Sequence, residues 1–168
     1  MRSMKSKELI YRVASAVLTV LCLAGCMEPV DNAVKVDRLP HIYPDYVGVT
    51  IPAGIAPLDF NVEEEGITKV DVTVRGSRSG EIHMQGEWAE FDIDDWKALT
   101  KANIGGKLNV DVCAKGEDGK WKQYRGFDIH VSVFPLDDYG LTYRHIQPGY
   151  EVGGNIGIYQ RDLHSFDE

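Results

Sequence analysis

The residue with the clearest chemical context in this sequence is Cys26, which follows Leu23, Ala24 and Gly25. The first twelve residues carry four basic side chains and one acidic one, and the run Val13–Leu23 has no charge. A charged start, an apolar run of roughly 7–15 residues and small residues before a cleavage point are typical of a secretory signal. The run is shorter than the roughly 20 apolar residues that span a bilayer. We therefore predict cleavage directly before Cys26.

The four residues Leu23-Ala24-Gly25-Cys26 resemble the bacterial lipobox. The resemblance implies that a diacylglyceryl group joins the Cys26 thiol and that residues 1–25 are then removed as a lipoprotein signal peptide. It also implies three fatty acyl chains such as palmitate, which would hold the protein stably in the cell envelope. We expect the outer membrane, in its periplasmic or its surface-facing leaflet. The alternatives are an ordinary signal peptide that contains Cys26 and an uncleaved anchor helix.

Charge and cysteine content narrow the classes of partner. The sequence has 18 Lys and Arg against 26 Asp and Glu, and residues 1–25 hold four of the bases and one of the acids. The mature chain would therefore have 14 bases, 25 acids and a net charge of -11. Such a surface repels phosphates, so we predict no nucleic-acid partner. Because Cys22 leaves with the signal and Cys26 carries lipid, Cys113 has no disulfide partner.

The segment after the cleavage point is predicted to be a tether. Residues 26–44 contain Pro29 and Pro40, and the polar stretch up to Pro40 has no hydrophobic period. The acidic Glu28 and Asp31 loosely resemble surface-export signals of some Gram-negative anaerobes. A solvated linker explains these two residues equally well.

Residues 45–134 carry the pattern of a β domain. Val70, Val72 and Val74 alternate with polar residues, and this period of two indicates a half-buried strand. Similar patterns predict strands near residues 47–51, 82–84, 89–93, 108–112, 121–125 and 127–133. Short strands separated by turn residues favour an antiparallel, immunoglobulin-like β-sandwich, with a small barrel as the alternative.

One short helix is predicted over Asp94–Leu99, with Asp94 as its N-cap. Asp92, Asp94 and Asp95 also offer oxygen ligands for Ca²⁺, but the glycine and distal Glu of an EF-hand are missing, so capping is favoured. The five His residues are scattered, and no Cys-x-x-Cys, Gly-x-Ser-x-Gly, phosphate-binding or dinucleotide-binding motif occurs. We therefore predict no metal, no cofactor and no enzyme activity.

Aromatic side chains supply the candidate binding residues. Trp121, Tyr124 and Trp88 are predicted to stack on a sugar ring or a protein partner, and Trp121, beside a hairpin turn, is expected to be the most exposed. Packing within the core is the competing interpretation. Residues 135–168 are predicted to form an irregular extension rich in glycine. Their five aromatic residues indicate that the extension packs on another surface.

Two stretches resemble the N-terminal part of exported TolB-like lipoproteins of Gram-negative anaerobes. One contains His41-Ile42-Tyr43-Pro44-Asp45-Tyr46, Thr50-Ile51-Pro52 and Ile55-Ala56-Pro57-Leu58. The other contains Tyr143-Arg144, Pro148-Gly149-Tyr150-Glu151 and Gly157-Ile158-Tyr159-Gln160-Arg161-Asp162-Leu163. The resemblance implies that the chain corresponds to the region before a β-propeller. Some relatives carry a Cys-x-x-Cys-His segment, which is absent here, so no haem role is implied.

These features together predict a membrane-anchored envelope lipoprotein that acts by binding or as a scaffold, with a protein or glycan partner. One alternative is a glycan-binding accessory lipoprotein. The other is a hydrolase, which would need a pocket with convergent carboxylates or a Ser/His pair.

Overall fold

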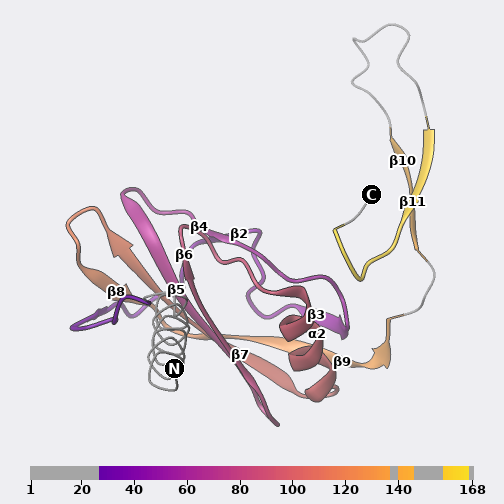
Figure 1. The fold of residues 1–168 in the computed structure, drawn as a ribbon, viewed down its shortest axis with the longest axis horizontal. Helices are drawn as coiled ribbons and strands as arrows, with labels where there is room; N and C mark the ends of the chain where they lie inside the picture. The colour runs from indigo at the N-terminus through magenta and orange to yellow at the C-terminus, as the bar shows by residue number, and fades with distance from the viewer. Residues whose placement is uncertain (1–26, 137–139, 146–156, 167–168) are drawn as a thin grey trace, which may run out of the picture.

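The computed structural model describes residues 27–136, 140–145 and 157–166, and it is mainly β as predicted (Figure 1). Its elements are β1 (Val34–Lys35), β2 (Ile42–Tyr43), β3 (Thr50–Ala53), β4 (Asn61–Val62), β5 (Ile67–Gly76), β6 (Glu81–Gly86), α2 (Ile93–Ala102), β7 (Lys107–Gly116), β8 (Trp121–Gln123), β9 (Phe127–Pro135), β10 (Leu141–His145) and β11 (Gly157–Arg161). Several sheets and one described helix are consistent with the predicted β-sandwich. The finer immunoglobulin-like arrangement stays a prediction.

The main sheet is built around β5 and β7, which pair antiparallel along most of their length. β6 covers the other edge of β5, while the other edge of β7 is shared by β9 and β8. β1 then pairs with β8, and β3 pairs with β9, and both of these pairs are parallel. The other pairs of this sheet are antiparallel, as the predicted sandwich requires. Parallel neighbours come from distant parts of the chain, so the local pattern carries no sign of them.

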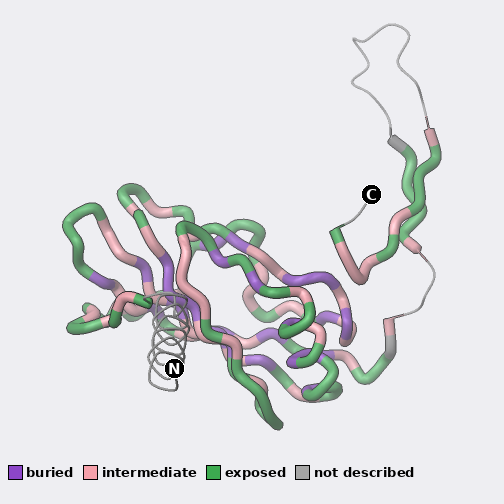
Figure 2. Tube along the Cα trace, viewed as in Figure 1, coloured by how far each residue is buried: buried purple, intermediate pink, exposed green. Residues whose placement is uncertain are grey.

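One face of the sheet forms the core. Val72 and Val74 of β5 have no exposed surface, and Leu108 of β7 has none either. Helix α2 covers part of this face with Trp96 and Leu99, both buried. Figure 2 shows buried segments along the strands of the domain and exposed ones at its turns. Each such side chain stabilises the fold by about 1.5–3 kcal/mol when it leaves water. The opposite face carries the polar residues that alternate with these apolar ones.

Helix α2 is longer than predicted at both ends, and its N-cap is Asp92 instead of Asp94. The Asp92 Oδ1 atom accepts the backbone N–H groups of Asp94 and Asp95 at 2.9 and 3.0 Å. The strand predicted over residues 89–93 is also wrong, because only Ala89 forms a bridge, to Phe60. Phe91 instead stacks on Trp96 of the helix with ring centroids 5.3 Å apart. The apolar residues that suggested a strand therefore lie at the start of the helix, where Phe91 packs against Trp96.

The prediction of a tether over residues 26–44 is wrong for the described part of that range. β1 pairs with β8, and the Val36 backbone N–H donates to the Gln123 carbonyl at 2.8 Å. β2 pairs with β4, and Ile42 of β2 is buried in the core. Strands of two residues are too short to show a hydrophobic period, so this segment looks like a linker in the sequence.

The prediction of an irregular extension over residues 135–168 is also corrected. β9 continues to Pro135, and β10 pairs antiparallel with β11 to form a hairpin (Figure 1). The Tyr143 and Tyr159 rings stack across this hairpin with centroids 5.8 Å apart. After β11 the chain returns to the domain, where the Ala56 backbone N–H donates to the Leu163 carbonyl at 2.8 Å. The described part of this segment thus packs partly on itself and partly contacts the loop after β3. Residues 137–139, 146–156 and 167–168 of the predicted extension lie outside the described residues.

Candidate functional site

The predicted lipid-attachment residue Cys26 and its neighbours Leu23, Ala24 and Gly25 lie outside the described residues. Met27 is the first residue that the structure describes. Glu28, two residues after Cys26, lies on the polar outer face of the main sheet, where it contacts Gln85 and Lys69.

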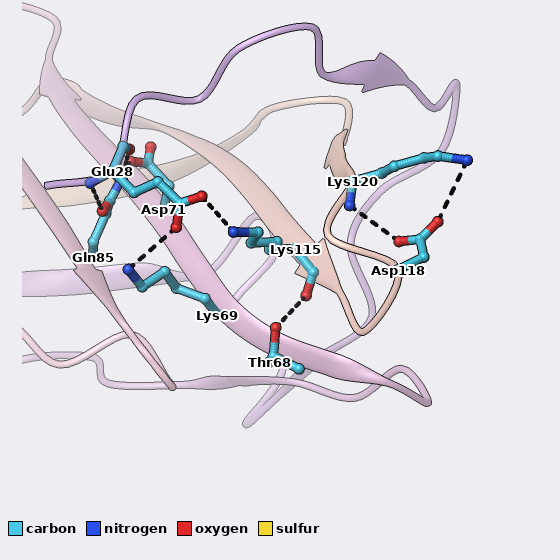
Figure 3. A network of polar contacts seen from close by, with 8 residues as sticks. All are labelled: Glu28, Thr68, Lys69, Asp71, Gln85, Lys115, Asp118 and Lys120. Atoms are coloured by element: carbon cyan, nitrogen blue, oxygen red, sulfur yellow. Dashed lines mark hydrogen bonds and ion pairs between the residues drawn. The ribbon is translucent and has the colours of Figure 1, made fainter.

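Glu28 is held on this face by a set of contacts that we call the Glu28 clamp, formed with Gln85, Lys69 and Lys115 (Figure 3). The Glu28 backbone N–H donates to Gln85 Oε1 at 2.8 Å, and Gln85 Nε2 donates to the Glu28 carbonyl at 2.6 Å. The Glu28 carboxylate accepts a hydrogen bond from Lys115 Nζ and lies 3.6 Å from Lys69 Nζ. The hydrogen bond from Lys115 is the main reason that the pKa of Glu28 is lowered.

The partners in the clamp come from three adjacent strands, β6, β5 and β7. Lys69 and Lys115 are register partners across β5 and β7, so their side chains leave the sheet on the same face. Asp71 orients Gln85, because Asp71 Oδ2 accepts from Gln85 Nε2 at 2.6 Å and from His83 Nε2 at 2.8 Å. Both hydrogens of the Gln85 amide therefore have acceptors, and its oxygen accepts from Glu28.

Two of the three predicted stacking residues are buried, which contradicts their proposed role. Trp121 is 4% exposed, and its ring lies beneath the Lys115 ammonium, 5.8 Å from the ring centroid. Tyr124 is 3% exposed and belongs to the core cluster, with the Arg38 guanidinium 5.2 Å from its ring centroid. Trp121 follows a turn, as predicted. It is the register partner of Lys115 on β7, and the Lys115 side chain lies over its ring.

Arg38 belongs to a second contact that holds the N-terminal segment. Its guanidinium lies 2.8 Å from the carboxylate of Glu64, whose side chain is mostly buried. Burial, followed by the neighbouring Glu64 carboxylate, raises the pKa of the Tyr124 hydroxyl. The hydroxyl therefore stays protonated and neutral beside the ion pair, and with 3% exposure Tyr124 leaves little of its ring open for stacking on a ligand.

Trp88 is the predicted stacking residue that remains accessible, with 45% of its surface exposed. It lines a shallow depression of about 670 Å³ together with Asn61, Ile67, Thr68 and Glu87. An exposed indole beside an amide, a hydroxyl and a carboxylate combines a stacking surface with hydrogen-bonding groups. This combination suits the polar edges and flat apolar faces of a sugar ring.

A second depression, of about 630 Å³, brings together the carboxylates of Asp59, Glu90 and Asp92. Asp59 Oδ1 accepts the Phe91 backbone N–H at 2.9 Å, and burial raises the pKa of Asp59. Asp92 caps helix α2. Two of the three carboxylates thus hold the backbone that leads into the helix, which favours a structural role over the hydrolase alternative.

Cys113 lies on the outer face of β7, opposite Asp71 on β5. Burial, with the nearby carboxylates of Asp71 and Asp111, raises the pKa of its thiol to about 11. The thiol is therefore protonated at neutral pH and is a poor nucleophile there. Within the described part of the chain, no group of three His, Cys, Asp or Glu side chains is placed to hold a metal ion.

No protein-family model and no curated protein sequence matches the chain. The relationship to exported TolB-like lipoproteins therefore stays a prediction. Among the described residues, no helix has the length and apolar character needed to cross a bilayer.

Proposed function

We propose that the protein is a cell-envelope lipoprotein, anchored through acylated Cys26, whose β domain acts as a binding or scaffold module without catalysis. The observation that carries the proposal is the run Leu23-Ala24-Gly25-Cys26 at the end of a charged and then apolar segment. Glu28, two residues after Cys26, already contacts the main sheet through Gln85 and Lys69, so the folded domain follows the proposed cleavage point directly.

The anchor is tested by replacing Cys26 with Ala in the full chain. We expect metabolic labelling with an alkyne fatty acid to disappear and the uncleaved precursor to accumulate. Any protein that is still cleaved should no longer be found in the membrane fraction. Cys22→Ala and Cys113→Ala are matched controls, since each removes a cysteine that lies outside the proposed attachment point. Unchanged labelling and membrane association in the Cys26→Ala variant would refute the anchor.

The second candidate function is glycan binding at Trp88, and the depression around that residue favours it. Asn61, Thr68 and Glu87 line the same surface as the exposed indole, so a sugar stacked on Trp88 would have hydrogen-bonding groups beside it.

A glycan array followed by titration calorimetry tests this candidate. We expect binding that Trp88→Ala abolishes and that Phe134→Ala retains. Phe134 is a suitable control because it is also an exposed aromatic residue, lies on β9 and does not line this depression. The absence of any hit on the array, or a hit that the Trp88→Ala variant retains, would count against a glycan site here.

A further inference from the structure

We propose that the end of the main sheet that carries the Glu28 clamp is the membrane-proximal surface of the molecule. In this arrangement the clamp, instead of a flexible tether, sets the distance and orientation of the domain at the bilayer. The inference rests on the proposed acylation of Cys26. It goes further by assigning one surface of the domain to the lipid headgroups.

The short connection between the clamp and the attachment point supports the proposal. Cys26 precedes Glu28 by two residues, and consecutive Cα atoms are about 3.8 Å apart, so their Cα atoms lie within about 8 Å. A flexible tether over residues 26–44 would instead reach about 60 Å when extended. With Glu28 bound to Gln85, Lys69 and Lys115, the acylated residue has no comparable freedom to move away from the sheet.

The position of the clamp along the sheet gives the domain an orientation. The clamp lies near the start of β5, at Lys69, and the turn after Gly76 lies seven residues further along the strand. At about 3.3 Å per residue this places the turn about 23 Å from the clamp. Figure 1 shows the β10–β11 hairpin at the opposite end of the molecule from the first described residues. The hairpin would therefore point into the aqueous compartment.

The exposed side chains near the clamp fit a position at the membrane surface. Met27 is half exposed, and Trp88 follows Gln85 by three residues, which keeps its Cα within about 11 Å of that of Gln85. An indole suits the boundary between headgroups and water, because it combines an apolar ring with an N–H donor. The proximal surface is thus defined by Met27, Gln85, Glu87, Trp88 and the two lysines of the clamp, Lys69 and Lys115.

The clamp itself is tested by hydrogen–deuterium exchange on the full, purified lipoprotein. Glu28→Ala removes the ion pairs, and Gln85→Ala removes both contacts to the Glu28 backbone. We expect exchange of the Glu28 amide, which donates to Gln85, to rise by about tenfold in each variant and further in the double variant, because the segment opens locally. Asp31→Ala is the matched control: this acidic residue forms no ion pair with the described residues, and exchange should stay at the wild-type rate. Unchanged exchange in the double variant would overturn the clamp.

The orientation is tested with the lipoprotein reconstituted in vesicles of phosphatidylethanolamine and phosphatidylglycerol. In a Cys113→Ala background, a fluorophore is attached at Glu87→Cys near the clamp or at Ser79→Cys in the distal turn. Quenching by lipids with a headgroup nitroxide should be strong at position 87 and weak at position 79. The contrast should be lost in the Glu28→Ala, Gln85→Ala double variant and kept in Asp31→Ala.

The mass of the same protein sample reports whether Cys26 is acylated. Acylated protein with equal quenching at the two positions overturns the orientation and leaves the proposed anchor standing. Protein that lacks the acyl groups overturns the anchor and with it the orientation at the bilayer, while the exchange experiment still decides whether the clamp forms.

Discussion

Replacing Asn103 with Ala should be among the most damaging polar substitutions in this domain. Asn103 has no exposed surface and sits at the C-cap of α2. Its Nδ2 atom donates to the carbonyls of Ser79 and Leu99, each at 2.8 Å, and its Oδ1 atom accepts the Arg78 N–H at 2.8 Å. One side chain thus joins the end of the helix to the turn between β5 and β6. Gly76 makes room for it, because a Cβ there would lie 2.2 Å from Nδ2.

The expected loss follows from these contacts. A hydrogen bond contributes about 0.5–1.5 kcal/mol net, so three well-formed bonds contribute about 3 kcal/mol to the free energy of unfolding. Water can reach part of the turn, so the groups left without Asn103 regain some hydration. For a domain of this size such a loss lowers Tm by about 10 °C. Asn103→Asp should lower the free energy of unfolding by at least as much, because its carboxylate would face the carbonyl oxygens of Ser79 and Leu99.

Urea and thermal unfolding, followed by far-ultraviolet circular dichroism, measure this loss. Asn61→Ala is the control: Asn61 is an exposed asparagine on β4, and its replacement should change the free energy of unfolding by less than about 0.5 kcal/mol. A loss below about 1 kcal/mol for Asn103→Ala would refute the reasoning, because three bonds contribute about 1.5 kcal/mol even at the lower end of their range.

Three further outcomes are expected. Trp88 is the exposed tryptophan, so acrylamide should quench mainly its fluorescence, and Trp88→Phe should remove most of the quenchable signal; equal quenching after that change would contradict the burial of the other two. At pH 8 the Cys113 thiolate should be about 100-fold scarcer than that of an ordinary thiol, because its pKa is about 11, so iodoacetamide should alkylate it slowly until urea unfolds the domain. The pKa values of Glu28 and Asp128 are lowered, chiefly by hydrogen bonds from lysines, so both carboxylates stabilise the fold above their unfolded pKa. This contribution is lost as the pH falls below the unfolded pKa and through the lowered folded pKa, and Glu28→Gln should make the urea midpoint fall less steeply with decreasing pH.

The longer strands could be predicted from the sequence because their core residues alternate. Val70, Val72 and Val74 face the core in β5, as the period of two indicates, and the residues between them face the other side. The same rule misled at Ala89–Ile93, where the alternation seats a helix. A short apolar alternation does not indicate whether the residues pack against a strand or against a helix.

The candidate site was less predictable than the strands. The exposure of Trp88 agrees with the expectation for a binding residue, whereas Trp121 and Tyr124 are buried. Burial of an aromatic ring depends on which side chain the neighbouring strand places beside it. For Trp121 that side chain is Lys115, and the pairing of the two residues follows from the hairpin register.

By itself the sequence determined the strand periodicity, the existence of one helix in the β domain, and the chemical context of Cys26. These features depend on residues close together in the chain, and local spacing records them. Only the tertiary structure decided that the segment after Cys26 is held on the sheet. The contacts of Glu28 reach Gln85 and Lys115, which are 57 and 87 residues away. These contacts form only after the strands have paired, so no local pattern in the sequence predicts them.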